Sequence, residues 1–255
     1  MNIDSLFSLR GLTAVVTGGS SGIGRAIALA LGAAGASVVI LARDATRIER
    51  VVAEIGAAGG RAAGVVGDLS TRDGIREVGD AAAEPFGEPD ILVNSAGINL
   101  RPPFDEIDMD VWDATMSVNL EAPFLLSRRF APAMLERGFG RLIHISSQQA
   151  HRAFVTSGVY GVSKGGLESL TRSQAEAWSA RGVTANTLVP GFVLTPLNAR
   201  LQDDTEKVRE LAERTMVGRN GLPEDFGGIA VFLAGRSSGY VTGQSLFVDG
   251  GLSVH

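Results

Sequence analysis

A glycine-rich stretch near the N-terminus, TGGSSGIG at Thr17 to Gly24, constrains the fold more than any other feature of this sequence. It follows a short apolar run, Leu12 to Thr17, and opens a helical pattern that extends from Gly22 to Ala34. Its glycines allow a tight turn in which backbone amides approach a pyrophosphate, and the helix N-terminus behind them favours negative charge. The stretch therefore predicts a dinucleotide site, and the lack of a Gly-Lys-Ser/Thr ending disfavours an ATPase loop.

Strand-like and helix-like patterns then alternate along the whole chain. Six further apolar runs are expected as strands: Ser37 to Leu41, Ala63 to Gly67, Asp90 to Asn94, Arg141 to Ser146, Val183 to Val189 and Ser245 to Val248. Continuous apolar strands between helices imply a parallel sheet covered on both faces. No Pro- or Ser-rich linker divides the sequence. We therefore expect an α/β single-domain Rossmann fold over residues 1–255, a doubly wound parallel sheet of about seven strands with helices on both faces. A mobile, charged lid is expected over about residues 191–221.

The composition narrows the class of partner and the compartment. With no cysteine, the chain has neither disulfides nor thiolate ligands, which favours a cytoplasmic location. A net charge of −5 argues against nucleic acid as a partner. The uncharged stretch from Ala26 to Ala42 is shorter than the roughly 20 apolar residues of a membrane span, and glycines interrupt it, so we expect no membrane segment. None of the three histidines lies at metal-ligand spacing, so no metal site is expected.

The glycine spacing, Gly-x-x-x-Gly-x-Gly, resembles that of the short-chain dehydrogenase/reductase family. Further along, the YGVSK stretch resembles the family's Tyr-x-x-x-Lys motif, NSAG its Asn-Asn-Ala-Gly element with a departure at Ser95, and FVDGG its C-terminal motif. The resemblance extends over about residues 8 to 251. It implies an NAD(P)-dependent oxidoreductase that acts on a small-molecule carbonyl or alcohol and assembles as a homotetramer. Two stretches, Asn94 to Phe104 and Gly140 to Gln149, are similar to those of gluconate 5-dehydrogenase-type members.

The family's site residues can be carried over motif by motif. The resemblance implies cofactor contacts from Gly18, Ser20, Ser21, Gly22, Ile23, Gly24, Arg43, Asp68, Leu69, Asn94, Ala96, Gly97, Tyr160, Lys164, Pro190, Gly191, Val193 and Thr195. It also implies a catalytic set of Asn119, Ser147, Tyr160 and Lys164.

The end of the second predicted strand discriminates between the two dinucleotides. An acidic side chain there binds a ribose 2′-hydroxyl and repels a 2′-phosphate. The family's acidic position is Ala42 in this sequence, and Arg43 follows it with a donor fork suited to phosphate. NADP(H) is therefore favoured. NAD(H) stays possible if Asp44 binds the ribose instead of capping the next helix.

The chemistry needs a tyrosine that works near neutral pH, although its ordinary pKa is about 10. Tyr160 and Lys164 are four residues apart on a predicted helix, so the ammonium can lower the pKa of the phenol. Tyr160 would then act as acid or base at the substrate oxygen, with Ser147 bonding the same oxygen. The family implies that Lys164 also binds the nicotinamide ribose and that Asn119 anchors a water for proton transfer.

The substrate is the least determined property. Gln149, or its neighbour Gln148, could bond substrate hydroxyls, Arg101 could bind a carboxylate, and Phe192 is a third pocket candidate, which favours a sugar acid or polyol. A 3-oxoacyl thioester reductase stays an alternative, which a basic patch including Arg128 and Arg129 would support. A non-catalytic, dinucleotide-binding regulatory protein is the other alternative.

Overall fold

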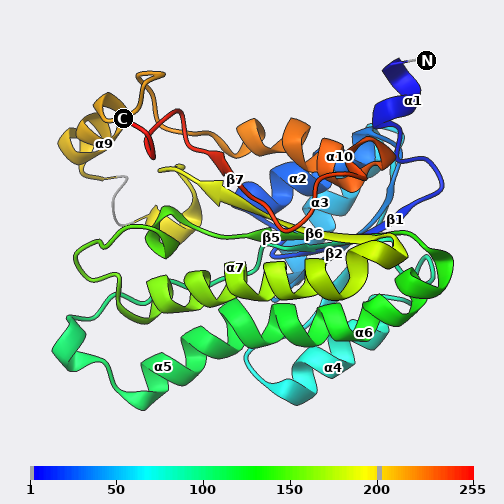
Figure 1. Ribbon diagram of the computed structural model, residues 1–255, viewed down its shortest axis with the longest axis horizontal. Helices are drawn as coiled ribbons and strands as arrows, with labels where there is room; N and C mark the ends of the chain where they lie inside the picture. The colour runs from blue at the N-terminus through cyan, green and yellow to red at the C-terminus, as the bar shows by residue number, and fades with distance from the viewer. Residues whose placement is uncertain (1–2, 200–202) are drawn as a thin grey trace.

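The computed structural model describes residues 3–199 and 203–255, and in this part of the chain seven strands form one parallel sheet (Figure 1). The strand order is β3-β2-β1-β4-β5-β6-β7. The strands are β1 (Thr13–Thr17), β2 (Ser37–Ala42), β3 (Arg61–Val66), β4 (Ile91–Asn94), β5 (Gly140–Ile145), β6 (Val183–Pro190) and β7 (Ser245–Val248). All seven predicted strands are confirmed; β3 begins two residues earlier than predicted, because its pairing with β2 starts at Arg61.

Helices cover both faces of this sheet (Figure 1). The α-helices of the described residues are α1 (Ile3–Phe7), α2 (Gly22–Ala33), α3 (Ala45–Ala57), α4 (Arg72–Ala81), α5 (Met109–Met116), α6 (Ala122–Arg137), α7 (Gly158–Trp178), α9 (Thr205–Glu213) and α10 (Gly227–Ala234). The single-domain doubly wound fold is therefore confirmed. No helix among the described residues is long and apolar enough to cross a membrane.

Two apolar layers hold the sheet between the helices. Val16 and Ile40 point to one side, where they pack with α2, α3 and α10. Their strand neighbours Val15 and Val39 point to the other side, where they pack with α4, α6 and α7. Because successive residues of a strand face opposite sides, strands buried on both faces are apolar throughout.

The sheet order reverses beside β1, since β2 lies on one side of it and β4 on the other. In open α/β sheets, ligands bind at the carboxyl ends of the strands where the order reverses. The loops after β1, β2, β4 and β5 therefore meet at one edge, and they carry most of the predicted site.

Two irregular segments lie near the site. A π-helical turn at Ser117–Glu121 separates α5 from α6, so these two helices do not form one regular helix. The expected lid contains a short 3₁₀ turn, Pro196–Asn198, and α9, while residues 200–202 lie outside the described part of the chain. Its mobility stays a prediction.

Candidate active site

The glycine loop joins β1 to α2 with backbone that only glycine adopts easily. Gly18 has φ +64°, and a Cβ atom there would lie 2.8 Å from the backbone nitrogen of Ala96. A Cβ on Gly24 would lie 2.5 Å from the carbonyl oxygen of Gly18. Ser21, the N-cap of α2, makes no side-chain capping bond, so the first amides of α2 are not bonded by their cap residue. This open cradle fits the pyrophosphate of a dinucleotide.

A cavity of about 400 Å³ continues from the loop along the ends of β2 and β3. Its lining includes Ser20, Ser21, Arg43, Asp68 and Leu69, five of the predicted cofactor residues. The structure thus brings the glycine loop and the strand-end residues together around one hollow of the size an adenosine group needs.

Arg47 also lines this cavity, and we did not predict it. Asp44 caps α3 by accepting a bond from the Arg47 backbone nitrogen at 3.0 Å, and its other oxygen lies 3.2 Å from Arg47 Nε. The capping interpretation of Asp44 agrees with this geometry. Two arginines, Arg43 and Arg47, therefore line this cavity. The three-residue spacing within the first turn of α3 is the signal that could have identified Arg47.

The loop after β4 is held from below by buried polar groups. Thr17 Oγ1 accepts bonds from the backbone nitrogens of Ser95 and Ala96, each at 3.1 Å. The Asn94 side chain is turned into the core, where its amide lies 3.1 Å from His144 Nδ1. Gly97 lies beside Asn119 and Lys164, at hypothetical Cβ distances of 3.3 and 3.7 Å. Of this segment, Ala96 and Gly97 line the cavity, whereas the Asn94 side chain supports it.

Tyr160 and Lys164 lie on α7, 5% and 4% exposed. Lys164 Nζ is 5.7 Å from the centre of the Tyr160 ring and donates to the carbonyl oxygen of Ile145 at 2.8 Å. The Ser147 hydroxyl and the charge of Arg101 both lie close enough to the Tyr160 phenol to lower its pKa. Three of the four predicted catalytic residues therefore converge.

The electrostatics correct one expectation. We predicted that Lys164 lowers the pKa of Tyr160, but burial raises this pKa, and the Ser147 hydrogen bond and the Arg101 charge offset that rise only in part. Burial also lowers the pKa of Lys164 to about 8. Desolvation disfavours the charged form of each group, the phenolate of Tyr160 and the ammonium of Lys164. The phenol therefore stays protonated, as a proton donor must.

Asn119 lies in the π-helical turn and is fully buried. Its side-chain oxygen accepts from Ile98 N at 2.9 Å, and its amide donates to Ile98 O at 2.9 Å and to Ser163 Oγ at 3.1 Å. A π-helical turn inserted in an α-helix commonly occurs at functional sites. Here the Asn119 side chain fastens the loop after β4 to α7, and its predicted role in anchoring a water stays a prediction.

The predicted substrate residues are placed unequally. Arg101 lies close enough to Tyr160 to act on its pKa, and Asn99, with its amide turned to satisfy both groups, accepts from Arg101 Nη2 at 3.0 Å and Nε at 3.1 Å. Gln149 instead accepts a bond from Ser157 Oγ at 2.7 Å. Phe192 lines a separate cavity of about 380 Å³ beside the C-terminal turns. Of these three residues, Arg101 is the one whose charge acts on the Tyr160 phenol.

The segment after β6 lies against the glycine loop. A Cβ on Gly22 would lie 3.3 Å from Thr195, so Thr195 lies over the glycine loop. Gly191 lies against Asp249, at a hypothetical Cβ distance of 2.9 Å, and the buried Val193 pairs with Gly221.

Among the described residues, we find no group of three or more acidic or histidine side chains able to hold a metal ion.

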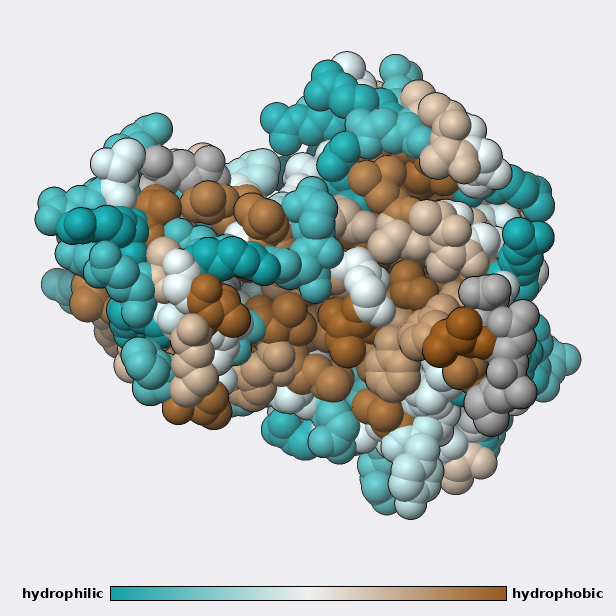
Figure 2. Space-filling model, turned by 90° about the horizontal axis from the view of Figure 1, so that it is seen from above, coloured by the Kyte–Doolittle hydropathy of each residue, from teal (hydrophilic) through white to brown (hydrophobic). Residues whose placement is uncertain are grey.

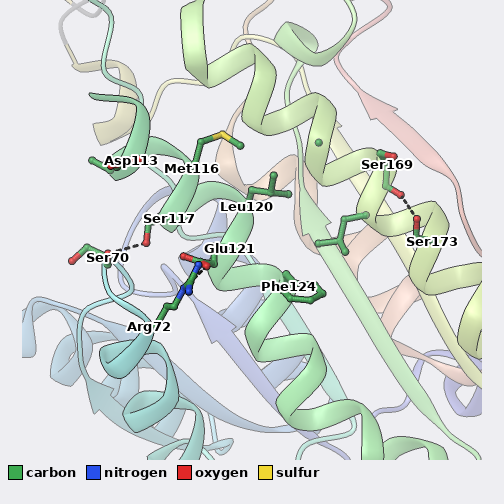
Figure 3. Close-up of a pocket in the computed structure, with 13 residues that line it drawn as sticks. Ser70, Arg72, Asp113, Met116, Ser117, Leu120, Glu121, Phe124, Ser169 and Ser173 are labelled. Carbon is green, nitrogen blue, oxygen red and sulfur yellow. Dashed lines mark hydrogen bonds and ion pairs between the residues drawn. The ribbon is translucent and has the colours of Figure 1, made fainter. Parts of the chain in front are cut away.

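A larger hollow adjoins the adenosine cavity and shares Ser70 and Ala114 with it. A groove of about 990 Å³ runs between α5, α6 and α7, and Met116, Leu120 and Phe124 face it from one side with Ser169 and Ser173 on the other (Figure 3). It contains none of the predicted catalytic residues. We therefore do not assign it to the reaction.

Comparison with known proteins places this geometry in a wider context. A protein-family model described as enoyl-(acyl carrier protein) reductase matches residues 18–253. Gluconate 5-dehydrogenase of Gluconobacter oxydans (strain 621H) is 38% identical over 254 residues, which cover 100% of this chain and 99% of that protein. Galactitol 2-dehydrogenase (L-tagatose-forming) of Cereibacter sphaeroides is 37% identical over 258 residues, 100% of both. The crystal structure of a gluconate 5-dehydrogenase from Burkholderia cenocepacia J2315, in complex with NADP and tartrate, has a TM-score of 0.93 at 37% identity and covers 100% of each chain.

Proposed function

This chain belongs to the short-chain dehydrogenase/reductase family, and from that premise we propose that it interconverts a ketone and a secondary alcohol of a sugar acid or polyol with NADP(H). The observation that carries the proposal is the buried meeting of Tyr160, Ser147 and Lys164 beside the glycine cradle. Each residue alone is common on any helix or loop. Their convergence beside a cavity that begins at the glycine loop is the arrangement that a dinucleotide-dependent oxidoreductase requires.

The chain's own residues supply position and protons. The bound coenzyme supplies or accepts the hydride. Tyr160, kept protonated by burial, donates its proton to the carbonyl oxygen during reduction and takes it back during oxidation. Ser147 bonds the same oxygen and so holds it near the phenol. Lys164, whose Nζ lies 5.7 Å from the centre of the Tyr160 ring, would hold the nicotinamide ribose, and its positive charge would favour the phenolate form of Tyr160.

NADP(H) is the coenzyme that the strand-end chemistry supports. Arg43 and Arg47 both line the adenosine cavity, and Asp44, the acid beside them, is used as a helix cap. A 2′-phosphate would therefore meet donors without meeting an unpaired carboxylate. The gluconate 5-dehydrogenase of Burkholderia cenocepacia was crystallised with NADP, which agrees with this assignment.

A sugar acid is the substrate class that Arg101 supports. Its guanidinium, steadied by Asn99, acts on the catalytic phenol and so lies where a bound carboxylate could reach it. Relatives named for gluconate and galactitol agree with a hydroxylated substrate. The thioester alternative has weaker support than expected, because Arg129 is paired with Asp80 and Glu88 at 2.7 and 2.8 Å, which leaves Arg128 as the exposed cation of that patch.

The test compares NADPH oxidation with 5-ketogluconate, with a neutral ketose and with an aryl ketone. We expect clear preference for 5-ketogluconate. Arg101→Ala should raise KM for it by about tenfold or more, as expected for a lost charge-assisted hydrogen bond, while leaving KM for the neutral ketose unchanged. Preference for the aryl ketone would overturn the sugar-acid assignment. No turnover with any ketone would favour the non-catalytic regulatory alternative.

Assembly and location complete the proposal. We expect a homotetramer in which the groove between α5, α6 and α7 packs against a second copy (Figure 3). A second apolar surface lies over α10 and β7, and Figure 2 shows apolar side chains gathered in the middle of that face. The half-buried Ile229 and Phe232 belong to α10. The cytoplasmic location expected from the cysteine-free composition stays a prediction.

A further inference from the structure

Glu168 is a buried carboxylate for which the proposed chemistry has no use. It lies on α7, one turn beyond Lys164, and is 5% exposed. Our sequence analysis did not single it out, although the four-residue spacing from Lys164 places both side chains on the same side of the helix. Burying a carboxylate is costly unless several donors surround it, so its partners indicate what it does.

Three donors from three different segments meet on this carboxylate. Oε1 accepts from the Ser146 hydroxyl at 2.5 Å and from His151 Nε2 at 3.0 Å. Oε2 accepts from the Ser245 hydroxyl at 2.9 Å. Ser146 follows β5, His151 follows the short turn Gln148–Ala150, and Ser245 begins β7. Two of the three donors therefore flank the segment that carries Ser147.

This segment, residues 146–152, is fastened from behind at several points. Gln148 Nε2 donates to Asp249 Oδ2 at 2.6 Å, and Arg152 Nη2 donates to Ser253 O at 2.7 Å. The His151 ring packs on Phe247 of β7 with 4.9 Å between ring centres. Ser147 Oγ instead accepts from Gln149 N at 3.2 Å and lies close enough to Tyr160 to lower the pKa of the phenol. The residues around Ser147 thus bond to α7 and to the C-terminal segment, whereas Ser147 itself acts on Tyr160.

We propose that Glu168 is a positioning residue of the dehydrogenase, which holds the Ser147 hydroxyl against Tyr160 through its bonds to Ser146 and His151. The inference rests on the proposed function, because it needs Ser147 to bond the substrate oxygen. Glu168 itself does not touch the reacting atoms. Its contribution is to keep the hydroxyl where the carbonyl oxygen must be when Tyr160 transfers its proton.

Two substitutions grade the loss of this anchor. Glu168→Leu removes every acceptor, and we expect kcat to fall by about tenfold to a hundredfold, because displacement of a catalytic group by about 1 Å has effects of that size. Glu168→Gln keeps one side-chain oxygen and should lose less. KM for the ketone and the affinity for NADPH, measured by fluorescence titration, should stay within about threefold in both variants, since the cradle is untouched.

Thr171→Val is the matched control. Thr171 is equally buried on α7, and its hydroxyl bonds only the carbonyl of Leu167. The substitution removes a buried hydrogen bond from the same helix without touching residues 146–152. We expect kcat within about twofold of the unmodified protein, because the lost bond is to Leu167 and not to the segment that carries Ser147, and independent sites usually have little effect on one another.

The decisive test is a double-mutant cycle with Ser147→Ala. If Glu168 acts through Ser147, then Glu168→Leu should lower kcat by less than about twofold in the Ser147→Ala background. Losses that multiply, or a Glu168→Leu protein with unchanged kcat, would overturn the inference; if that variant does not fold, unchanged kcat in Glu168→Gln overturns it. Unchanged kcat in Ser147→Ala alone would instead overturn the proposed role of Ser147, which is a separate failure.

Discussion

Tyr160 illustrates how burial sets the chemistry of a single residue. Its hydroxyl lies in a site that excludes most water, so its pKa rises above the ordinary value, and the neighbouring Ser147 and Arg101 limit that rise. Lys164 is desolvated by the same environment, which lowers its pKa to about 8. At neutral pH the phenol is therefore protonated, and the Lys164 ammonium still carries most of its charge.

The first prediction concerns these two residues. Tyr160→Phe removes the proton donor and leaves the ring in place, so turnover should fall by about 10²–10⁴-fold with NADPH affinity nearly unchanged. Lys164→Ala should weaken both turnover and NADPH binding, because it also holds the ribose. Steady-state kinetics and fluorescence titration measure the two effects. A Tyr160→Phe protein that keeps about a tenth of its activity or more would contradict the assignment.

The second prediction concerns coenzyme choice. Combining Ala42→Asp with Arg43→Ala should shift the ratio of kcat/KM for NADPH and NADH toward NADH by one to two orders of magnitude, or roughly 1–3 kcal/mol for a charged contact. Arg47→Ala should shift this ratio less, since the Arg47 guanidinium is already paired with the Asp44 carboxylate. Arg50→Ala, on the same helix and exposed, is the control and should leave the ratio unchanged. Equal efficiency with both coenzymes in the unmodified protein would remove the basis of this prediction.

At the scale of elements, buried polar bonds tie the strands that carry the site to α7. His144 on β5 lies between Asn94 at the end of β4 and Gln174 on α7, at 3.1 and 2.9 Å. The Asn94 amide donates to Nδ1, so Nε2 carries the proton and donates to Gln174. His144 is therefore a core residue, fully buried and bonded through both ring nitrogens. Burial lowers its pKa from 6.5 to about 4.

The third prediction follows from this shift. Between pH 6.5 and 4 the unfolded chain binds a proton at His144 that the folded protein does not, so stability falls as pH falls through this window, by up to about 3 kcal/mol. His144→Asn cannot titrate. The variant should be less stable at pH 7 because it loses buried bonds, and the difference in free energy of unfolding should shrink by pH 4.5. Urea unfolding at both values measures it, and a difference that does not change with pH would contradict the prediction.

At the scale of the whole molecule, one edge of the sheet gathers the chemistry, and two apolar surfaces flank it. The glycine loop, the adenosine cavity and the Tyr160 site all lie at the carboxyl ends of the strands. The groove beside α7 adjoins the adenosine cavity, with which it shares Ser70 and Ala114, and the second apolar face lies over α10 and β7 (Figures 2 and 3). Large exposed apolar surfaces commonly mark interfaces.

The fourth prediction tests that assembly. Gly165 lies beside the groove on α7, and a Cβ there meets no heavy atom of the same chain within 4 Å. Gly165→Leu should therefore fold as well as the unmodified protein but keep a second α7 from approaching. Sedimentation should show a tetramer for the unmodified protein and smaller species for the variant. Gly56→Leu, an equally open helix position on α3, should stay tetrameric. An unmodified protein that sediments only as a 26.6 kDa species at micromolar concentration would contradict the tetramer.

The sequence by itself determined the features that depend on neighbours along the chain. Apolar runs and glycine spacing predicted all seven strands and the phosphate cradle, because strand burial and tight turns are local properties. The Tyr160–Lys164 pair was predicted from the resemblance of its motif to that of the family. The capping role of Asp44 was equally visible, since a cap bonds within its own first turn. What these patterns could not predict is the π-helical turn at Asn119, which bonds to Ile98 in a distant loop.

Only the tertiary structure decided which side chains meet and which charges are desolvated. Glu168 draws its three partners from segments up to 77 residues away, and Asp249 reaches Gln148 from 101 residues along the chain. The rise in the pKa of Tyr160, opposite to our expectation, arises from burial that the helical spacing does not reveal. Hydrogen bonds between distant segments and desolvation depend on how the whole chain packs, so neither leaves a periodic trace in the sequence.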